Sequence, residues 1–298
     1  MNTILKALPT TTMQSTTMPS TTINISQNII GTCQNHLLAS LSYAELSIWE
    51  HELELVDLHL GQVLCEPGMK HTHVIFPTTA IVSLLYTTQE GTSSEIAVVG
   101  NDGVVGISVF MGGNETANQA LVQSAGQGYR LRTQAARNAV NRSGPLLQML
   151  LRYTQAMIAQ IAQTAVCNRH HSIDQQLCRR LLLGLDRLQG DDLMMTQEQL
   201  ANLLGVRRES VTAAALKLQE AGLIHYSRGH ITVLDRESLE DRCCECYAIV
   251  KNEHHRLFPS ISQYSVSTRR GLNTPIANHH HQIPTSIHQQ KNTSMAYS

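Results

Sequence analysis

The segment that most constrains the fold covers residues 196–224, TQEQLANLLGVRRESVTAAALKLQEAGLI. In a frame that begins at Gln197, the fifth position is Ala201, the ninth is Gly205 and the fifteenth is Val211. A small residue lets two helices cross at close range, and a glycine can adopt the positive φ of a tight turn. Leucines at helical spacing supply the rest of an apolar face. The frame therefore predicts a helix-turn-helix.

The second helix of this motif is expected to cover about residues 207–221. A helix in this position reads base edges in the DNA major groove with its N-terminal residues. Arginine matches the acceptors of guanine, and glutamate can accept from cytosine. Gln197 and Ser210 are placed to reach phosphates. The candidate DNA-binding residues of the two helices are Gln197, Arg207, Arg208, Glu209, Ser210 and Thr212.

A β-hairpin is predicted directly after the second helix, where short apolar runs flank Arg228 and Gly229. After a helix-turn-helix such a hairpin is interpreted as a wing, and Arg228 at its tip is a candidate phosphate contact. The alternative is a surface hairpin without a DNA contact. Residues 196–236 hold five Arg/Lys and four Asp/Glu. One such module should therefore bind phosphates weakly, and a dimer would bind better.

Short β-rich runs separated by turn residues occupy the region before residue 134 and predict an antiparallel barrel or jelly roll. The expected strands are residues 56–60, 63–65, 73–76, 80–87, 93–99, 119–124 and 129–133. One or two short helices are expected within 37–53, and longer helices over 145–166, 172–188 and 236–257. The apolar stripe of the 145–166 helix favours helix pairing in a homodimer, the alternative being a helix packed wholly on its own barrel.

This order of elements resembles the Crp-Fnr family of bacterial transcription regulators. The resemblance is strongest over residues 195–234, where Arg208-Glu209-Ser210-Val211 is similar to the Arg-Glu-Thr-Val that opens the family's recognition helix. It implies a homodimer that binds pseudo-palindromic promoter sites in double-stranded DNA and contacts RNA polymerase. Ala213 stands where the cAMP-binding members carry a third base-reading arginine, so a different target sequence is expected.

The resemblance also implies an effector domain of the cyclic-nucleotide-binding type, with a changed pocket. Val104 occupies the place of the glutamate that takes the ribose hydroxyl, and Asn114 that of the arginine that takes the cyclic phosphate. Without that charge-assisted pair a cyclic phosphate binds poorly. The effector is therefore unknown and not expected to be cAMP. The weak effector-binding candidates are Gly103, Val104, Gly106, Asn114 and Thr116.

The seven cysteines give no cofactor site by spacing. An iron–sulfur cluster needs four thiolates, but only Cys33 precedes the barrel and Cys65 lies within it. Cys243 and Cys246 lie on one face of the predicted last helix, where a structural role, a redox pair or a metal site are all conceivable. No pattern selects a haem-ligating histidine, and no catalytic motif is present. We therefore expect no cofactor, no metal and no enzymatic activity.

The predicted fold class is α+β, with an N-terminal jelly-roll barrel, a long dimerisation helix and a C-terminal winged helix-turn-helix. The predicted domains are a disordered tail over 1–35, a cyclic-nucleotide-binding-like domain over 36–142 and connecting helices over 143–190. A DNA-binding domain over 191–258 and a second tail over 259–298 follow. The chain lacks a long apolar run and an export signal, so we expect a cytoplasmic protein away from membranes.

The favoured function is a sequence-specific, homodimeric transcriptional regulator. One alternative is a redox-responsive regulator that is switched through Cys65 or through Cys243 and Cys246. Another is a nucleotide-binding signalling module whose helix-turn-helix contacts only proteins.

Overall fold

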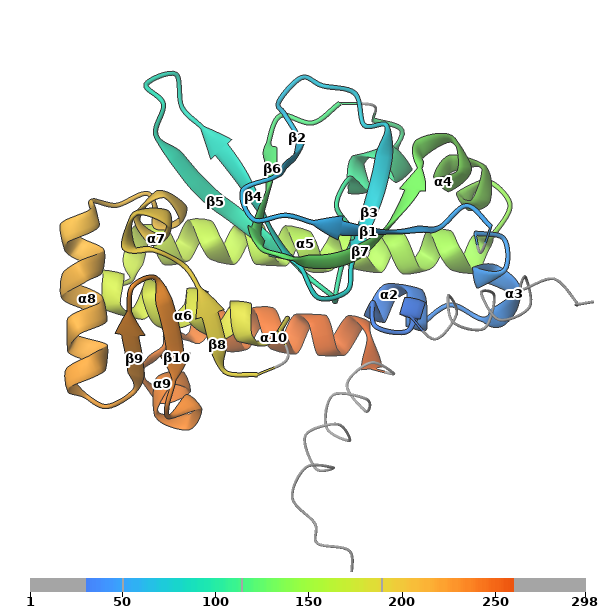
Figure 1. Ribbon diagram of the computed structural model, residues 1–298. Helices are drawn as coiled ribbons and strands as arrows, with labels where there is room; N and C mark the ends of the chain where they lie inside the picture. Colours follow the sequence, from blue (N-terminus) through green and yellow to red (C-terminus); the bar gives the residue numbers. More distant parts are fainter. Residues whose placement is uncertain (1–30, 50, 114, 189, 260–298) are drawn as a thin grey trace, which may run out of the picture.

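Two facing antiparallel sheets form the N-terminal barrel in the computed structural model, which describes residues 31–49, 51–113, 115–188 and 190–259 (Figure 1). The strand orders are β1-β7-β3 and β2-β6-β4-β5. Buried apolar side chains such as Phe76, Val122 and Leu131 fill the space between the sheets. The strands are β1 Glu54–Leu58, β2 Val63–Cys65, β3 His73–Pro77, β4 Ile81–Thr87, β5 Ser93–Val99, β6 Gln119–Ser124 and β7 Gly126–Arg132. The predicted jelly-roll barrel is confirmed.

Short helices gather at one end of the barrel (Figure 1). Asn35 caps the first of them, accepting from the amides of Leu37 and Leu38 while donating to the carbonyl of Pro77. Asn35 is fully buried, although it falls at the end of the predicted tail 1–35. Residues 1–30 and 260–298, which make up most of the two predicted tails, lie outside the described residues. The short helices are α2 His36–Ala39, α3 Tyr43–Leu46, the 3-10 helix η1 Ile107–Met111 and α4 Thr133–Val140. The last two were not predicted from the sequence.

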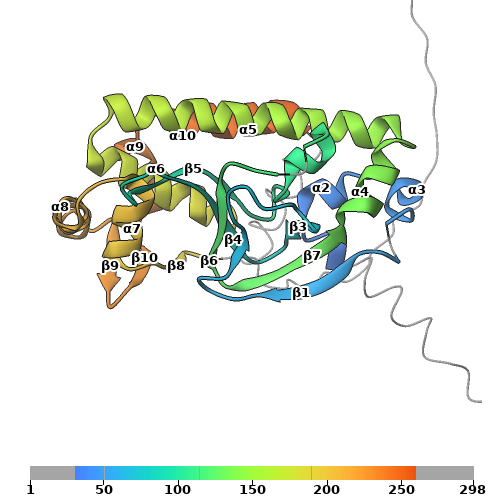
Figure 2. The same ribbon diagram turned by 90° about the horizontal axis from the view of Figure 1, so that it is seen from above.

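The long helix α5, Gly144–His170, passes along the whole barrel (Figure 2). Ser143 begins it by accepting from the amide of Leu146. Leu150 and Met157 face the barrel core, and the Tyr153 hydroxyl donates to the carbonyl of Val104 at 3.2 Å. The predicted long helix is therefore present and extends one turn further than expected.

The C-terminal part is built on one apolar core to which the barrel also contributes. Ile81, Leu85 and Val98 of the barrel pack in the same cluster as Leu181 of α6 and Leu218 of α8. Two ion pairs cross this boundary, Arg180–Glu95 at 2.8 Å and Arg187–Asp102 at 2.7 Å. The elements are α6 Ile173–Leu185, β8 Asp192–Met194, α7 Gln197–Leu204, α8 Arg208–Glu220, β9 Ile224–Ser227 and β10 His230–Val233. The C-terminal part is thus fixed against the barrel.

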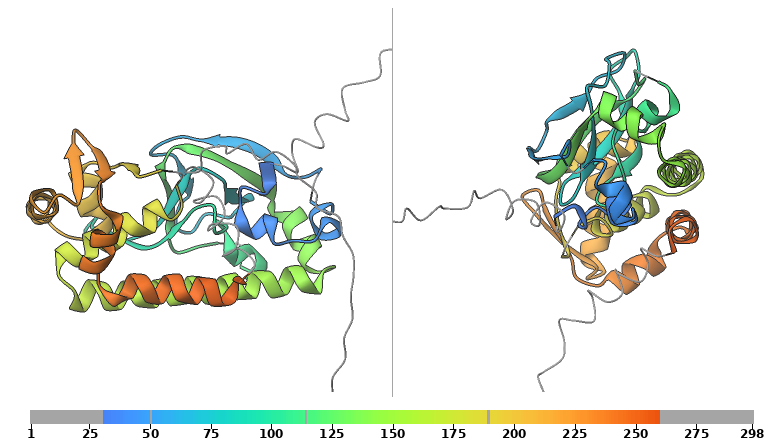
Figure 3. Two further views of the ribbon diagram at one scale, coloured as in Figure 1. Left: turned by 90° about the horizontal axis from the view of Figure 1, so that it is seen from below. Right: turned by 90° about the vertical axis from the view of Figure 1, so that its right-hand side faces the viewer.

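The predicted last helix, 236–257, is broken into α9, Arg236–Arg242, and α10, Glu245–Leu257. Cys243 and Cys244 between them have extended backbone angles, with ψ 159° and 161°. Cys243 and Cys246 therefore do not share one helical face, and that expectation was wrong. After the break α10 returns along α5 in the opposite direction, and the Gln155 amide donates to Glu253 at 3.1 Å (Figure 3). Within the described residues, no helix is long and apolar enough to cross a membrane.

Candidate nucleic-acid interface

The turn between α7 and α8 has the geometry that the sequence frame predicts. Thr196 begins α7 with a capping box shared with Gln199. The helix ends at Gly205, which has φ 65° and whose amide donates to the carbonyl of Ala201. A Cβ atom at Gly205 would also lie 2.5 Å from the Ser94 hydroxyl of β5. Glycine is therefore required both by the backbone conformation and by the close approach of the barrel.

The α8 helix has one buried and one exposed face. Val211, Ala214 and Leu218 are at most 1% exposed and pack on α6 and α7. The opposite face lies on the outer edge of the molecule, away from the barrel (Figure 1). This exposed face consists of Arg208, Glu209, Thr212, Ala213, Leu216 and Lys217. It is free to enter a groove, as a recognition helix must.

The N-terminus of α8 offers unsatisfied backbone donors. Arg207 is the N-cap residue, and its side chain makes no capping hydrogen bond. The first amides of a helix lack intrahelical partners and attract anions. In the described part of the chain neither Arg207 nor Arg208 has an ion-pair partner, whereas Lys217 is paired with Asp174 at 3.0 Å. The two arginines therefore supply the free positive charge at this end of the helix.

The polar candidates between the two helices contact each other. The Thr212 hydroxyl donates to Gln197 Oε1 at 2.8 Å and to the carbonyl of Arg208 at 3.0 Å. Ser210 is half-buried at the side of α8. Gln197 is half-buried as well, so this hydrogen bond ties the start of α7 to the exposed face of α8.

The wing is a two-residue hairpin. Ser227 pairs with His230, so Arg228 and Gly229 form the loop, with φ 51° and 82°. Two positive φ values are typical of a type I′ turn, in which a long side chain is unusual. The loop is anchored to the start of α7, because the Met195 amide donates to the Gly229 carbonyl at 2.8 Å. Arg228 is exposed at the tip of the hairpin.

Two of the effector candidates, Gly103 and Val104, lie in an inward-facing stretch of the barrel. The Gly103 carbonyl accepts from Asn35 at 2.9 Å, and the side chain of Val104 is 1% exposed. Gly106 has φ 91° and begins η1. The Thr116 hydroxyl donates to Asn118. The fifth candidate, Asn114, lies outside the described residues.

Residues 175–242 match the family model described as the Crp-like helix-turn-helix domain. The chain carries a Crp-like helix-turn-helix domain. The match begins within α6, whose side chains pack with α8, so this helix belongs structurally with the Crp-like domain. Comparison with curated proteins gives no match.

Solved structures of Crp/Fnr regulators share the fold. A putative transcriptional regulator of the Crp/Fnr family from Eubacterium rectale matches with a TM-score of 0.55 and 19% identity, over 69% of this chain and 96% of that one. FixK2 from Bradyrhizobium japonicum matches with a TM-score of 0.55 and 14% identity, over 64% and 98% of the two chains. CLP, a c-di-GMP-responsive regulator from Xanthomonas campestris, matches with a TM-score of 0.52 and 14% identity, over 65% and 100%. The predicted Crp-Fnr resemblance is confirmed for the fold and for the Crp-like domain.

Proposed function

We propose that this protein is a sequence-specific DNA-binding transcriptional regulator that acts as a homodimer. The observation that supports it best is the exposed face of α8, which carries Arg208 and Glu209 on a Crp-like domain. Arg207 directly before this face and Arg228 at the wing tip are both exposed, and neither has an ion-pair partner among the described residues. Among the alternatives, a module that contacts only proteins would not need this arrangement.

Each candidate residue has a distinct role in the proposed complex. Arg208 reads a guanine, which discriminates by about 1–3 kcal/mol, and Glu209 accepts from a cytosine. Arg207, Arg228 and the first amides of α8 bind phosphates and set the register. Ser210 and Gln197 contribute further phosphate contacts. Thr212 faces the groove and holds Gln197 in place.

A second copy of the chain is proposed to pack on the outer face of α5. Large apolar side chains are exposed there although α5 is covered by the barrel and by α10 on its other sides. The exposed set is Leu147 at 38%, Leu151 at 56%, Ile158 at 61% and Val166 at 43%. They recur at close to the 3.5-residue spacing of paired helices. A dimer about this stripe would present two recognition helices to half-sites roughly 34–36 Å apart.

The barrel is proposed to respond to an effector other than cAMP, or to serve as a fixed scaffold. Val104 fills the place of the ribose-binding glutamate and is buried in the core, so it cannot replace that contact. An effector would act by favouring one spacing of the two recognition helices. The contact with RNA polymerase that the family resemblance implies stays a prediction.

The test is selection of genomic DNA fragments by the purified full-length protein, with and without oxidant. Wild type and Lys217→Ala should enrich the same palindromic site, because Lys217 is already paired with Asp174. Arg208→Ala should lose that site. Equal enrichment by Arg208→Ala would refute the proposed readout and favour the protein-contact module. Enrichment that depends on oxidant, and that is abolished by serine in place of Cys65 or of Cys243 and Cys246, would favour the redox-responsive alternative.

A further inference from the structure

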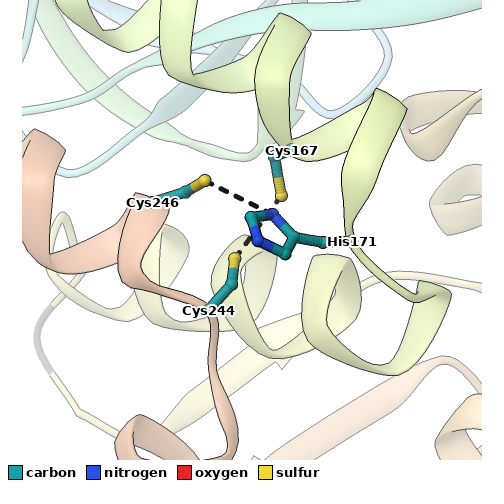
Figure 4. Close-up of side chains that lie close together, drawn as sticks. All are labelled: Cys167, His171, Cys244 and Cys246. Atoms are coloured by element: carbon teal, nitrogen blue, oxygen red, sulfur yellow. Dashed lines mark hydrogen bonds between the residues drawn. The ribbon is translucent and has the colours of Figure 1, made fainter.

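Three cysteines and one histidine converge where the end of α5 meets the start of α10 (Figure 4). Cys167 lies in the last turn of α5, and His171 follows at its C-cap. Cys244 is the N-cap of α10, and Cys246 lies in its first turn. The four potential ligand atoms all lie within 4.8 Å of one another. The proposed DNA-binding function uses none of these four side chains, and the redox-responsive alternative uses only Cys246 among them.

The distances fit one tetrahedral ion. The Sγ atoms of Cys167 and Cys244 are 3.6 Å apart, and Cys246 Sγ is 3.5 Å from His171 Nδ1. Two thiolates at about 2.3 Å from a tetrahedral zinc are separated by roughly 3.8 Å. A disulfide would need about 2.05 Å between sulfurs. An iron–sulfur cluster holds several irons between its ligands and needs a wider cage than this one.

The surroundings orient the histidine as a ligand. With Nδ1 of His171 facing the sulfur of Cys246, its Nε2 lies 3.3 Å from the Glu245 carboxylate. Metal-bound histidines commonly donate their second ring N–H to a carboxylate in this way. The Gln176 amide donates to the carbonyls of His171, at 2.9 Å, and Cys167, at 3.4 Å, which holds the end of α5 in position.

Burial and charge indicate a closed, structural site. Cys167 and Cys246 are fully buried and Cys244 is 4% exposed, which leaves no open coordination position toward solvent. Three thiolates and a divalent cation carry a net charge of −1. Arg179 is also buried and acts electrostatically on the thiols of Cys167 and Cys246. Its Nε has no hydrogen-bond partner among the described residues, so it is available to balance this charge.

We propose that Cys167, His171, Cys244 and Cys246 bind one Zn²⁺ ion, which fastens the start of α10 to the end of α5. Thiolate and imidazole ligands in a tetrahedron select zinc over the oxygen-binding divalent cations. The break between α9 and α10 places Cys244 in the site. Cys243 packs against the same cluster but is not one of the four ligands, and its Sγ lies 4.0 Å from the Gln175 carbonyl. The expectation of no metal is thereby replaced by a proposed zinc site.

The experiment is elemental analysis of the full-length protein, purified without added metal and washed with a weak chelator to strip any metal held by His279, His280 and His281. About one zinc per chain is expected for the wild type. Cys167→Ser and Cys244→Ser should each lose it. Cys243→Ser, which changes the residue adjacent to Cys244 but none of the four ligands, should keep it.

A second measurement on the wild type covers the case in which those variants fail to fold. Zinc is removed with a strong chelator and Co²⁺ is added, which should give the visible absorption of a tetrahedral thiolate site. The chelated protein should melt more than about 5 °C lower, and zinc should restore the transition. Absence of bound zinc with no tetrahedral Co²⁺ spectrum would overturn the proposal. So would iron with inorganic sulfide, a Cys167–Cys244 disulfide, or equal zinc loss in Cys243→Ser.

Discussion

Arg180 of α6 and Glu95 of β5 form an ion pair at 2.8 Å with side-chain exposures of only 4% and 9%. The Ser83 hydroxyl also donates to Glu95. This pair joins the Crp-like domain to the barrel through a region that excludes water. A buried pair adds little net stability over an apolar replacement, but it is costly to break from one side.

Glu95→Gln should destabilise the protein by about 3–5 kcal/mol, because it leaves the Arg180 charge buried without a counter-charge. Urea denaturation measures this change. The matched control is Glu54→Gln, which breaks an exposed pair with Arg130 and should leave the unfolding midpoint nearly unchanged. Similar small effects of both substitutions would show that water reaches Arg180.

Arg228→Gly should separate stability from DNA binding. Glycine removes the cost of the positive φ at this position, so stability should rise by about 1 kcal/mol. The same change removes one proposed phosphate contact per subunit, so the steepness of log K against log salt should fall by about 0.9 per subunit, or roughly 1.8 for the homodimer. Thermal melting and DNA titration over a range of salt concentrations measure the two effects. An unchanged salt slope would remove the wing from the interface.

Ile158→Glu should convert the proposed dimer into a monomer, because it places a charge at the most exposed apolar position of the α5 stripe. Light scattering after size-exclusion chromatography gives the mass. Leu234→Glu is a suitable control, since Leu234 is also 61% exposed but follows the last wing strand and is not part of the α5 stripe. A dimer that persists in Ile158→Glu would place the interface on another surface.

Stability should fall as the pH drops below about 6.5. Burial lowers the pKa of His36 and of His254 in the folded protein. The Asp102 carboxylate opposes this shift and the Arg187 guanidinium adds to it, so that the pKa of both histidines stays below its ordinary value. The unfolded chain then binds more protons, so the stabilisation is complete above the unfolded pKa and is lost as pH falls through the folded one. His36→Gln should flatten this loss, measured as urea midpoints across pH. The exposed His225→Gln should not, and a parallel profile for both variants would contradict the assignment.

Local patterns in the sequence predicted the parts of this structure that depend on local interactions. The frame of Ala201, Gly205 and Val211 locates both helices of the motif because a tight turn leaves few residue choices. Strands β2, β5 and β6 begin and end where their alternation predicts. The two-residue wing loop also follows from its flanking apolar runs.

Contacts between distant segments could not be predicted in this way. The Arg180–Glu95 pair depends on how α6 docks on the barrel, and the only signal for it is a pair of arginines in a leucine-rich helix. The Cys167–His171 spacing resembles half of a metal site, but its partners follow only after α10 turns back along α5. The broken helix at Cys243 and Cys244 had no proline or glycine to mark it.

The apolar core that Ile81 and Val98 share with Leu181 makes the barrel and the Crp-like domain a single cooperative unit. Domains joined only by a linker would exchange orientations at little cost. Here a rotation of the recognition helix relative to the barrel must expose part of the shared core to water. The free-energy cost of that exposure sets the population of any second orientation. An effector can drive such a rotation only by binding the rotated form more tightly by at least that amount.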